Sequence, residues 1–351
     1  MKWTLACLAV LLPVAFSCSA QVPMPGDDGM DAEQAARLRA AQDAVGAWYT
    51  RVAEQLATSG EARDLAFAAT LLEGAGQAAL GAGPPEGDVP SQAAPRDPRV
   101  DKWRQLASAR AGSDVVANLL LLQGDRAADA TVRKQALERW RKVEPDNLAP
   151  RLYAEGAVTD WLPQAGRHAR LDQHYYEQLR WMQAALAALP PGMDEAGVSG
   201  GGDLPADAAA AVAAAGILAA AVVPGLRPLS EACRDDALAT GPTRRADCRQ
   251  VARVAADTAD TSAGRMFGIG LLQATAATPA EQADAHERRR QLDWRMLAWG
   301  RVAGSQPDSG AVQFSRLLRD PSVRTERDLV ERVLAEAGVP AEPPPGWQPP
   351  H

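Results

Sequence analysis

Apolar residues recur three and four positions apart in the first part of the chain, a spacing that places side chains on one face of a helix. Two such stripes flank the turn sequence TSGE at 58–61. The first consists of Leu38, Val45, Trp48, Val52 and Leu56, and the second of Leu65, Ala69, Leu72 and Ala79. Asp31 with Gln34 has the pattern of a capping box before the first stripe. We therefore predict a helical hairpin over residues 21–81.

The helical periodicity resumes at Trp103 and predicts a second helical region over 101–190, followed by a third over 206–338. Near the end of the third region, Thr325 and Asp328 predict the start of a last helix, and Gly338 before Pro340 predicts its end. One apolar stripe of this third region consists of Leu292, Met296, Trp299 and Ala303. The stripe of the last helix consists of Leu329, Val333, Leu334 and Ala337. No segment alternates strictly between apolar and polar residues, as half-buried strands do. The predicted fold class is all-α, built from antiparallel helix pairs.

Three stretches interrupt the helical pattern. Residues 82–100 and 191–205 are rich in Pro and Gly and predict a linker and a flexible loop. Residues 339–351, VPAEPPPGWQPPH, predict a disordered proline-rich tail, because they lack the apolar residues for a core.

The alanine-rich segment 206–223 contains a single charge, at Asp207, and is long enough to suggest a membrane span. Alanine contributes little to membrane insertion, and only Ile217 and Leu218 are strongly favourable. A buried helix that packs closely against its neighbours is the interpretation we favour.

The stretch VEPDNLAPRLYAEG at 143–156 predicts a join between two helices. Pro145 cannot continue the preceding helix, and Asn147 can form the turn or cap the next helix. The join resembles those of tetratricopeptide repeat proteins, and weaker echoes occur as RDPRVDKWRQLA (96–107) and SQPDSGAVQFSRLL (305–318). The resemblance implies a tetratricopeptide-like right-handed solenoid, with an irregular helical bundle as the alternative. It also implies a concave surface that binds a protein or peptide.

The N-terminal residues 1–20 have the features of a secretory signal peptide: Lys2, an apolar stretch from Trp3 to Phe16, then small residues. Cleavage after Ala20 would release a soluble protein. Alternatively AFSC resembles a bacterial lipobox, in which Cys18 would carry the lipid. Both routes predict export, to the periplasm or to the outer membrane as a lipoprotein.

Cys233 and Cys248 stand 15 positions apart, with the turn formers TGP between them. A helix–turn–helix would bring them side by side, and an oxidising compartment would join them. We predict a structural disulfide between them, since neither has a nearby His partner for a metal or thiol site.

Two sites of candidate chemistry remain. His168 and Asp172 would share a face if RHARLDQH were helical, which makes a metal pair conceivable, whereas His174 would point elsewhere. A surface His–Asp pair is the interpretation that we favour, with no metal and no cofactor.

The segment SAGRMFGIGLLQATAATP at 262–279 resembles a segment of lytic transglycosylases, which cleave peptidoglycan. Those enzymes use a glutamic acid upstream as general acid. No Glu lies between Glu231 and Glu281, and the carboxylates nearest upstream of the segment are Asp257 and Asp260. We interpret FGIGLLQ as a helix that packs tightly through Gly268 and Gly270.

The formal net charge of −7 argues against nucleic-acid binding, which needs a basic face. The sequence therefore predicts a non-catalytic interaction or scaffold module of the bacterial cell envelope. A peptidoglycan-acting hydrolase is the alternative.

Overall fold

The structure is a computed structural model that describes residues 32–80, 96–125, 127–154, 156–191, 204–221, 225–239, 243–305 and 307–350. Within these ranges it contains α-helices, one 3-10 helix and no strand, so the all-α prediction is confirmed. The predicted signal peptide, Cys18 and Asp31 lie outside the described residues, as do the side chains of Gln34, Leu38 and Ala79.

The helices follow one another closely along the chain. In order they are α1 (Ala32–Ala57), α2 (Ala62–Leu80), α3 (Pro98–Arg110), α4 (Val115–Leu122), α5 (Ala130–Val143), α6 (Ala149–Leu152), α7 (Val158–Trp161), η1 (Leu162–Arg167), α8 (Tyr175–Ala187), α10 (Ala206–Ala220), α11 (Leu226–Ala232), α12 (Asp235–Leu238), α13 (Arg244–Thr258), α14 (Ser262–Thr275), α15 (Pro279–Ser305), α16 (Pro307–Arg319) and α17 (Glu326–Glu336).

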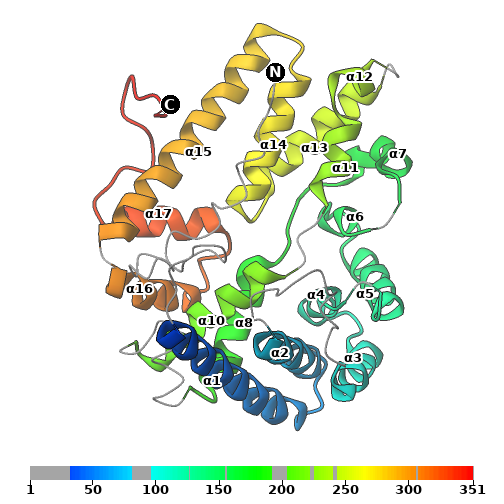
Figure 1. Cartoon of the computed structure of the whole chain (residues 1–351). Coiled ribbons are helices and arrows are strands. Elements are labelled where there is room, and N and C mark those ends of the chain that lie inside the picture. The colour runs from blue at the N-terminus through cyan, green and yellow to red at the C-terminus, as the bar shows by residue number, and fades with distance from the viewer. Residues whose placement is uncertain are drawn as a thin grey trace.

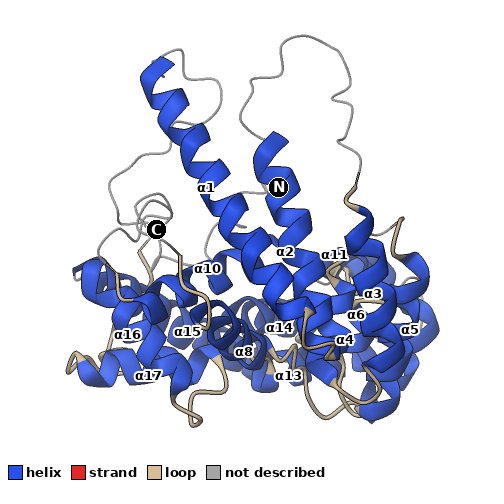
Figure 2. Cartoon of the chain, turned by 90° about the horizontal axis from the view of Figure 1, so that it is seen from below, coloured by secondary structure: helices blue, strands red, loops and turns tan. Residues whose placement is uncertain are grey.

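The first two helices form the predicted hairpin, and they lie side by side in Figures 1 and 2. The described stripe residues Trp48, Val52 and Leu65 are buried between them and their neighbours. The indole Nε1 of Trp48 also donates a hydrogen bond to the carbonyl oxygen of Leu189, 2.8 Å away. This bond attaches the hairpin to the end of α8.

Helix α3 begins at Pro98, inside the range 82–100 that was expected to be linker. Asp97 is the N-cap, because its carboxylate accepts a hydrogen bond from the amide of Arg99 at 2.8 Å. Pro98 follows at the first helical position, where its fixed φ suits a helix. The linker prediction is therefore wrong for residues 98–100, while 82–95 lie outside the described residues.

The alanine-rich segment forms α10, which packs against α8 and α16. Its buried face consists largely of alanines, among them Ala210, Ala211 and Ala214. Small side chains allow neighbouring helices to approach closely. In the part of the chain that the structure describes, no helix combines the length and apolarity required to cross a membrane.

Long-range packing places α8 and α10 between two groups of helices. Figure 1 shows α1 to α5 at one end of the molecule and α13, α14 and α15 at the other. Helix α8 contacts α1, α10 and α16, so it connects elements far apart in the sequence. The buried apolar residues of both groups belong to one continuous core.

Helices α13 and α14 cross at very close range. A Cβ atom on Gly268 would lie 2.3 Å from the amide nitrogen of Ala256 and 2.8 Å from the Cβ of Ala255. The prediction of tight packing through Gly268 is thus confirmed. It is wrong for Gly270, where an added Cβ would meet nothing within 4 Å, because that residue lies on another face of α14.

The last helix, α17, has both predicted ends. Thr325 Oγ1 accepts a hydrogen bond from the amide of Asp328, and the Asp328 carboxylate accepts one from the amide of Thr325, at 3.2 and 2.9 Å. At the other end Gly338 adopts a φ of 67°, and the amide of Val339 donates to the carbonyl of Leu334 at 2.9 Å. This is a capping box followed by a Schellman motif.

The segment after α17 does not fit the prediction of a disordered tail at 339–351, since residues 339–350 lie along α15 (Figure 1). The amide of Trp347 donates to the carbonyl of Pro344 at 3.1 Å, and Gly346 has a φ of 76°. Pro345 and Gly346 therefore occupy the central positions of a type II turn. The tail lacks a core of its own, but it packs on a helix that provides one.

Candidate functional site

Three segments that the sequence analysis singled out meet around residues 168–175. These are the helix join at 144–150, the His-containing segment itself and the turn between α13 and α14 that carries Asp260. The beginning of α17 completes the site. We call these four segments the polar junction.

The helix join is held by the segment 168–172. The amide of Leu148 donates to the carbonyl of Arg170 at 2.8 Å, and the amide of Ala169 donates to the carbonyl of Asp146 at 2.9 Å. The buried Asn147 side chain accepts a hydrogen bond from the amide of Ala149 at 3.0 Å, so it forms the turn before the short helix α6, whose N-cap is Leu148. Residues 168–172 are therefore extended rather than helical.

The expected His168–Asp172 pair does not form, because it required a helix. The His168 ring is buried, and burial lowers its pKa. Asp172 lies instead beside Arg170, with 3.3 Å between the Arg170 Nη1 and its carboxylate. Among the described residues, no cluster of three or more His, Cys, Asp or Glu side chains could hold a metal ion.

His174 is the residue of this segment that carries a strong electrostatic interaction. Its ring nitrogens lie 3.0 Å from a carboxylate oxygen of Glu144 and 3.1 Å from one of Glu177. Its backbone adopts a φ of 53°, the left-handed region that non-glycine residues rarely occupy. His174 thus stands immediately before α8 in a constrained conformation, held by Glu144 at the end of α5 and by Glu177 in the first turn of α8.

The hydrogen bonds between His174 and the neighbouring carboxylates shift the pKa values of both partners toward their charged forms. Burial lowers the pKa of His174, but the hydrogen bonds with Glu144 and Glu177 outweigh burial and raise it to about 10. Burial alone would raise the pKa of Glu144, yet hydrogen bonds from His174, Asn147 and Arg170 hold it well below its usual range. His174 is therefore a cation at neutral pH.

Asp260 holds the beginning of α8. Its Oδ1 accepts a hydrogen bond from the amide of Gln173 at 3.1 Å, and its Oδ2 accepts one from the amide of Tyr175 at 2.9 Å. Tyr175 is the first residue of α8, so a carboxylate from a distant turn takes the place of a local cap. Burial, with the negative charge of Asp172, raises the pKa of Asp260 to about 6.

Glu326 has the same role at another helix. Its carboxylate accepts a hydrogen bond from the amide of Ser262, the first residue of α14, at 2.5 Å. Its own amide donates to the carbonyl of Asp260 at 2.8 Å. Burial raises the pKa of this carboxyl as well. The beginnings of α8, α14 and α17 are thus linked to one another.

Two small cavities border the junction. One, of about 40 Å³, is lined in part by Gln123, Tyr153, Gln173, Tyr175 and Gln178. The other, of about 20 Å³, is lined in part by Tyr176, Thr261 and Glu326. Both volumes suit a few water molecules, whereas ligand pockets typically measure roughly 300–1,000 Å³.

The two carboxylates that were candidates for the general acid of a transglycosylase-like reaction lie in different surroundings. Asp260 is buried with both oxygens on backbone amides, as above. Asp257 is half exposed and forms an ion pair with Arg288 of α15. The structure therefore does not bring the two carboxylates together at one site.

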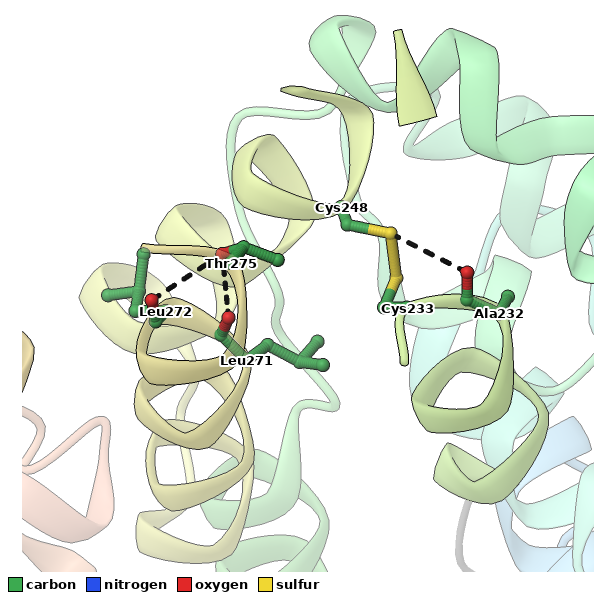
Figure 3. Close-up of a disulfide and its surroundings, with 6 residues drawn as sticks. All are labelled: Ala232, Cys233, Cys248, Leu271, Leu272 and Thr275. Atoms are coloured by element: carbon green, nitrogen blue, oxygen red, sulfur yellow. Dashed lines mark hydrogen bonds between the residues drawn. A yellow bond between two sulfur atoms is a disulfide. The ribbon is translucent and has the colours of Figure 1, made fainter. Parts of the chain in front are cut away.

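The predicted disulfide is confirmed. Cys233 at the end of α11 and Cys248 in α13 have sulfur atoms 2.07 Å apart (Figure 3). Helix α12 lies between them in the sequence, so the connection is longer than a simple helix–turn–helix. Arg249, next to Cys248, donates to the carbonyl of Thr275 at 3.4 Å, which ties the end of α14 to the same region.

A second buried set of charges lies between α2, α3 and the start of α5. Arg104 is fully buried and pairs with Glu73 and Asp129. Arg96 pairs with the same two carboxylates, at 2.6 Å from each. Gly124 makes room for this cluster, because a Cβ there would lie 2.5 Å from the Arg104 guanidinium. Two cations facing two anions give this cluster a structural role.

Comparison of the chain with protein-family models, with curated proteins and with solved structures gives no match. The class of protein is therefore defined by the fold alone: its described residues form an all-α fold in which a disulfide joins Cys233 and Cys248.

Sequence reasoning missed Glu326, Glu144 and the role of Asp260. Glu326 follows Thr325 and reads as an ordinary first-turn acid of a capped helix. Its side chain reaches a different helix, which local sequence patterns do not reveal. The one available signal was that Glu144 stands in the predicted helix join at 143–156.

Proposed function

We propose that this chain is an exported, non-catalytic helical protein that binds a protein or peptide partner in the bacterial cell envelope. The periplasm, or the outer membrane if Cys18 carries a lipid, is the compartment that we propose. The Cys233–Cys248 disulfide supports export, because such bonds persist in oxidising compartments.

The observation that carries the non-catalytic part of the proposal is the environment of Asp260. A general acid must reach the atom that it protonates, at about 2.6–3.2 Å or through one water. Both oxygens of Asp260 already accept backbone amides, and its side chain is buried. This arrangement supports a role in fixing α8 rather than in proton transfer.

For the arrangement of the helices, we propose an irregular bundle of antiparallel pairs with tetratricopeptide-like joins. In a solenoid each repeat contacts its sequence neighbours. The packing of α10 against α16, far along the chain, supports the bundle instead.

The test is capture of the partner by the mature chain from envelope extract, followed by crosslinking and mass spectrometry. A matched control is the Asp257→Ala variant, which changes an exposed ion pair and should leave the set of captured proteins unchanged. Recovery of no saturable, reproducible partner from envelope extract under oxidising conditions would count against the proposal.

A peptidoglycan-acting hydrolase is the second candidate function. The observation that favours it is the raised pKa of Asp260, because a raised pKa suits a general acid that works near neutral pH. The test is release of soluble fragments from purified wall material by the mature protein and by its Asp260→Asn variant. Turnover that the substitution abolishes, in a variant that still folds, would establish this second function and overturn the first.

A further inference from the structure

The proline-rich tail lies on α15 through a specific set of contacts. The indole Nε1 of Trp294 donates a hydrogen bond to the carbonyl of Pro340 at 2.9 Å. The guanidinium of Arg290 donates to the carbonyl of Trp347 at 3.3 Å. The rings of Trp294 and Trp347 meet edge to face, with centroids 5.3 Å apart. Arg290 and Trp294 are one helical turn apart, so they lie on the same face of α15.

Burial alternates along the tail. Residues 339, 341, 343, 347 and 349 are half-buried, whereas their even-numbered neighbours between 340 and 350 are exposed. This alternation is that of an extended segment lying on a surface. The type II turn at Pro345 and Gly346 interrupts it and brings Trp347 back onto Trp294.

The chemistry of the face matches an extended, proline-rich ligand. Six of the twelve residues 339–350 are proline, and proline offers a carbonyl acceptor but no backbone donor. A surface that recognises such a segment needs donors and an aromatic ring, which Arg290 and Trp294 provide. Burial lowers the pKa of the neighbouring Arg295 on α15, and the negative charge of Glu342 in the tail opposes this shift.

We propose that Arg290 and Trp294 form a docking site for extended proline-rich segments that carry a tryptophan, with the chain's own tail as the resident ligand. A partner protein that displays such a segment takes the place of the tail. This inference rests on the proposed interaction function and names the chemistry of the partner. The tail follows directly on α17, so its effective concentration at the site is high and a competing segment must displace it.

The experiment measures binding of a fluorescent peptide with the sequence of residues 339–350 by anisotropy. The proteins are the full mature chain and its Trp347→Ala variant, in which the resident tail loses its ring contact. We expect saturable binding to the variant and binding at least about tenfold weaker to the native chain, whose tail occupies the site. A peptide with alanine in place of its tryptophan should bind neither protein.

Further variants test the site itself, in the Trp347→Ala background. Trp294→Ala should abolish peptide binding, and Trp294→Phe, which keeps a ring but loses the hydrogen bond to Pro340, should weaken it. The matched control is Trp103→Ala, since Trp103 is a half-buried tryptophan of α3 that packs under Arg99. Far-UV circular dichroism verifies that each variant folds.

Absence of saturable binding to the Trp347→Ala protein would overturn the docking site, as would binding that Trp294→Ala leaves unchanged. If the native chain forms concentration-dependent dimers and the peptide dissociates them, the occupant of the site is the tail of a second copy. That result would overturn the assignment to a different partner. If envelope extract yields a partner while the peptide fails to bind, the proposed docking site is wrong, whereas the proposed interaction function is retained.

Discussion

The amide nitrogen of Glu326 donates a hydrogen bond to the carbonyl oxygen of Asp260 at 2.8 Å, while each residue uses its carboxylate to cap a helix that is not its own. Asp260 belongs to the turn before α14 and caps α8. Glu326 begins α17 and caps α14. Two side chains therefore fix the beginnings of α8 and α14, and the backbone bond between Glu326 and Asp260 links the beginning of α17 to them.

Replacement of Asp260 by alanine should destabilise the protein. The substitution leaves the amides of Gln173 and Tyr175 without their acceptor, and each buried group left unpaired costs about 1–3 kcal/mol. The measurement is urea unfolding followed by circular dichroism. Asp257→Ala is the control and should cost less than about 1 kcal/mol, because it removes an exposed pair.

The cost of Asp260→Ala should also depend on pH in a defined direction. The pKa of Asp260 is about 6 in the folded protein and about 3.9 in an unfolded chain. The folded state therefore binds the proton more tightly, and this carboxyl adds stability as the pH falls from 6 to 4. The difference between native and variant should grow over that interval, and a difference that instead grows above pH 6 would contradict the raised pKa.

Gly268→Ala should separate α13 from α14. The new Cβ would lie 2.3 Å from the amide nitrogen of Ala256, a backbone atom that cannot move without shifting the helix. We expect a loss of about 1–3 kcal/mol, as for other overpacked cores, measured by urea unfolding. Gly270→Ala in the same helix has open space and should stabilise by roughly 0.5–1 kcal/mol. Equal effects of the two substitutions would mean that the close crossing does not exist in solution.

The disulfide should contribute substantially to stability. The Cys233→Ser, Cys248→Ser double variant lacks a bond that closes a 15-residue loop, for which the chain-entropy relation gives about 3 kcal/mol. The measurement is the urea midpoint of the native protein, the reduced protein and the double variant. The reduced protein should match the double variant, and detection of two free thiols in protein taken from its native compartment would contradict the bond.

The sequence predicted those parts of the fold that depend on neighbouring residues. The stripes of the first hairpin, the Thr325–Asp328 box and the stop at Gly338 are all local patterns, and the structure contains them. The start of α3 was misplaced although Asp97 and Pro98 carried a local signal. The tail was misjudged because a segment without its own core can still dock on Trp294.

The polar junction could not be predicted in the same way. The sequence of residues 168–174 predicts a helix, but the backbone of this segment forms hydrogen bonds with the join at 146–148. The Asp260 carboxylate accepts hydrogen bonds from the amides of Gln173 and Tyr175. Backbone pairing with distant segments overrides local helical preference. The same long-range contacts give structural roles to Glu144, which is half-buried, and to Glu326, which is buried, although both are ordinary acids in the sequence.

The ion pairs of His174 lead to the final prediction, which concerns the His174→Asn variant. Asparagine tolerates the left-handed backbone, so this substitution tests the ring and its charge without adding strain. At pH 7 we expect a loss of about 1–3 kcal/mol, since the half-buried Glu144 and the exposed Glu177 both lose their partner. His174→Ala should cost more than His174→Asn, because alanine adds backbone strain to the same loss.

The pH dependence separates the charge from simple packing. The folded pKa of His174, about 10, lies above the unfolded value of about 6.5. The stability that it supplies is therefore complete below pH 6.5 and is lost as the pH rises through 10. Urea unfolding at pH 6, 8 and 10 should show the native protein approaching the variant. A constant difference across these three pH values would show that the imidazole acts by its shape and not by its charge.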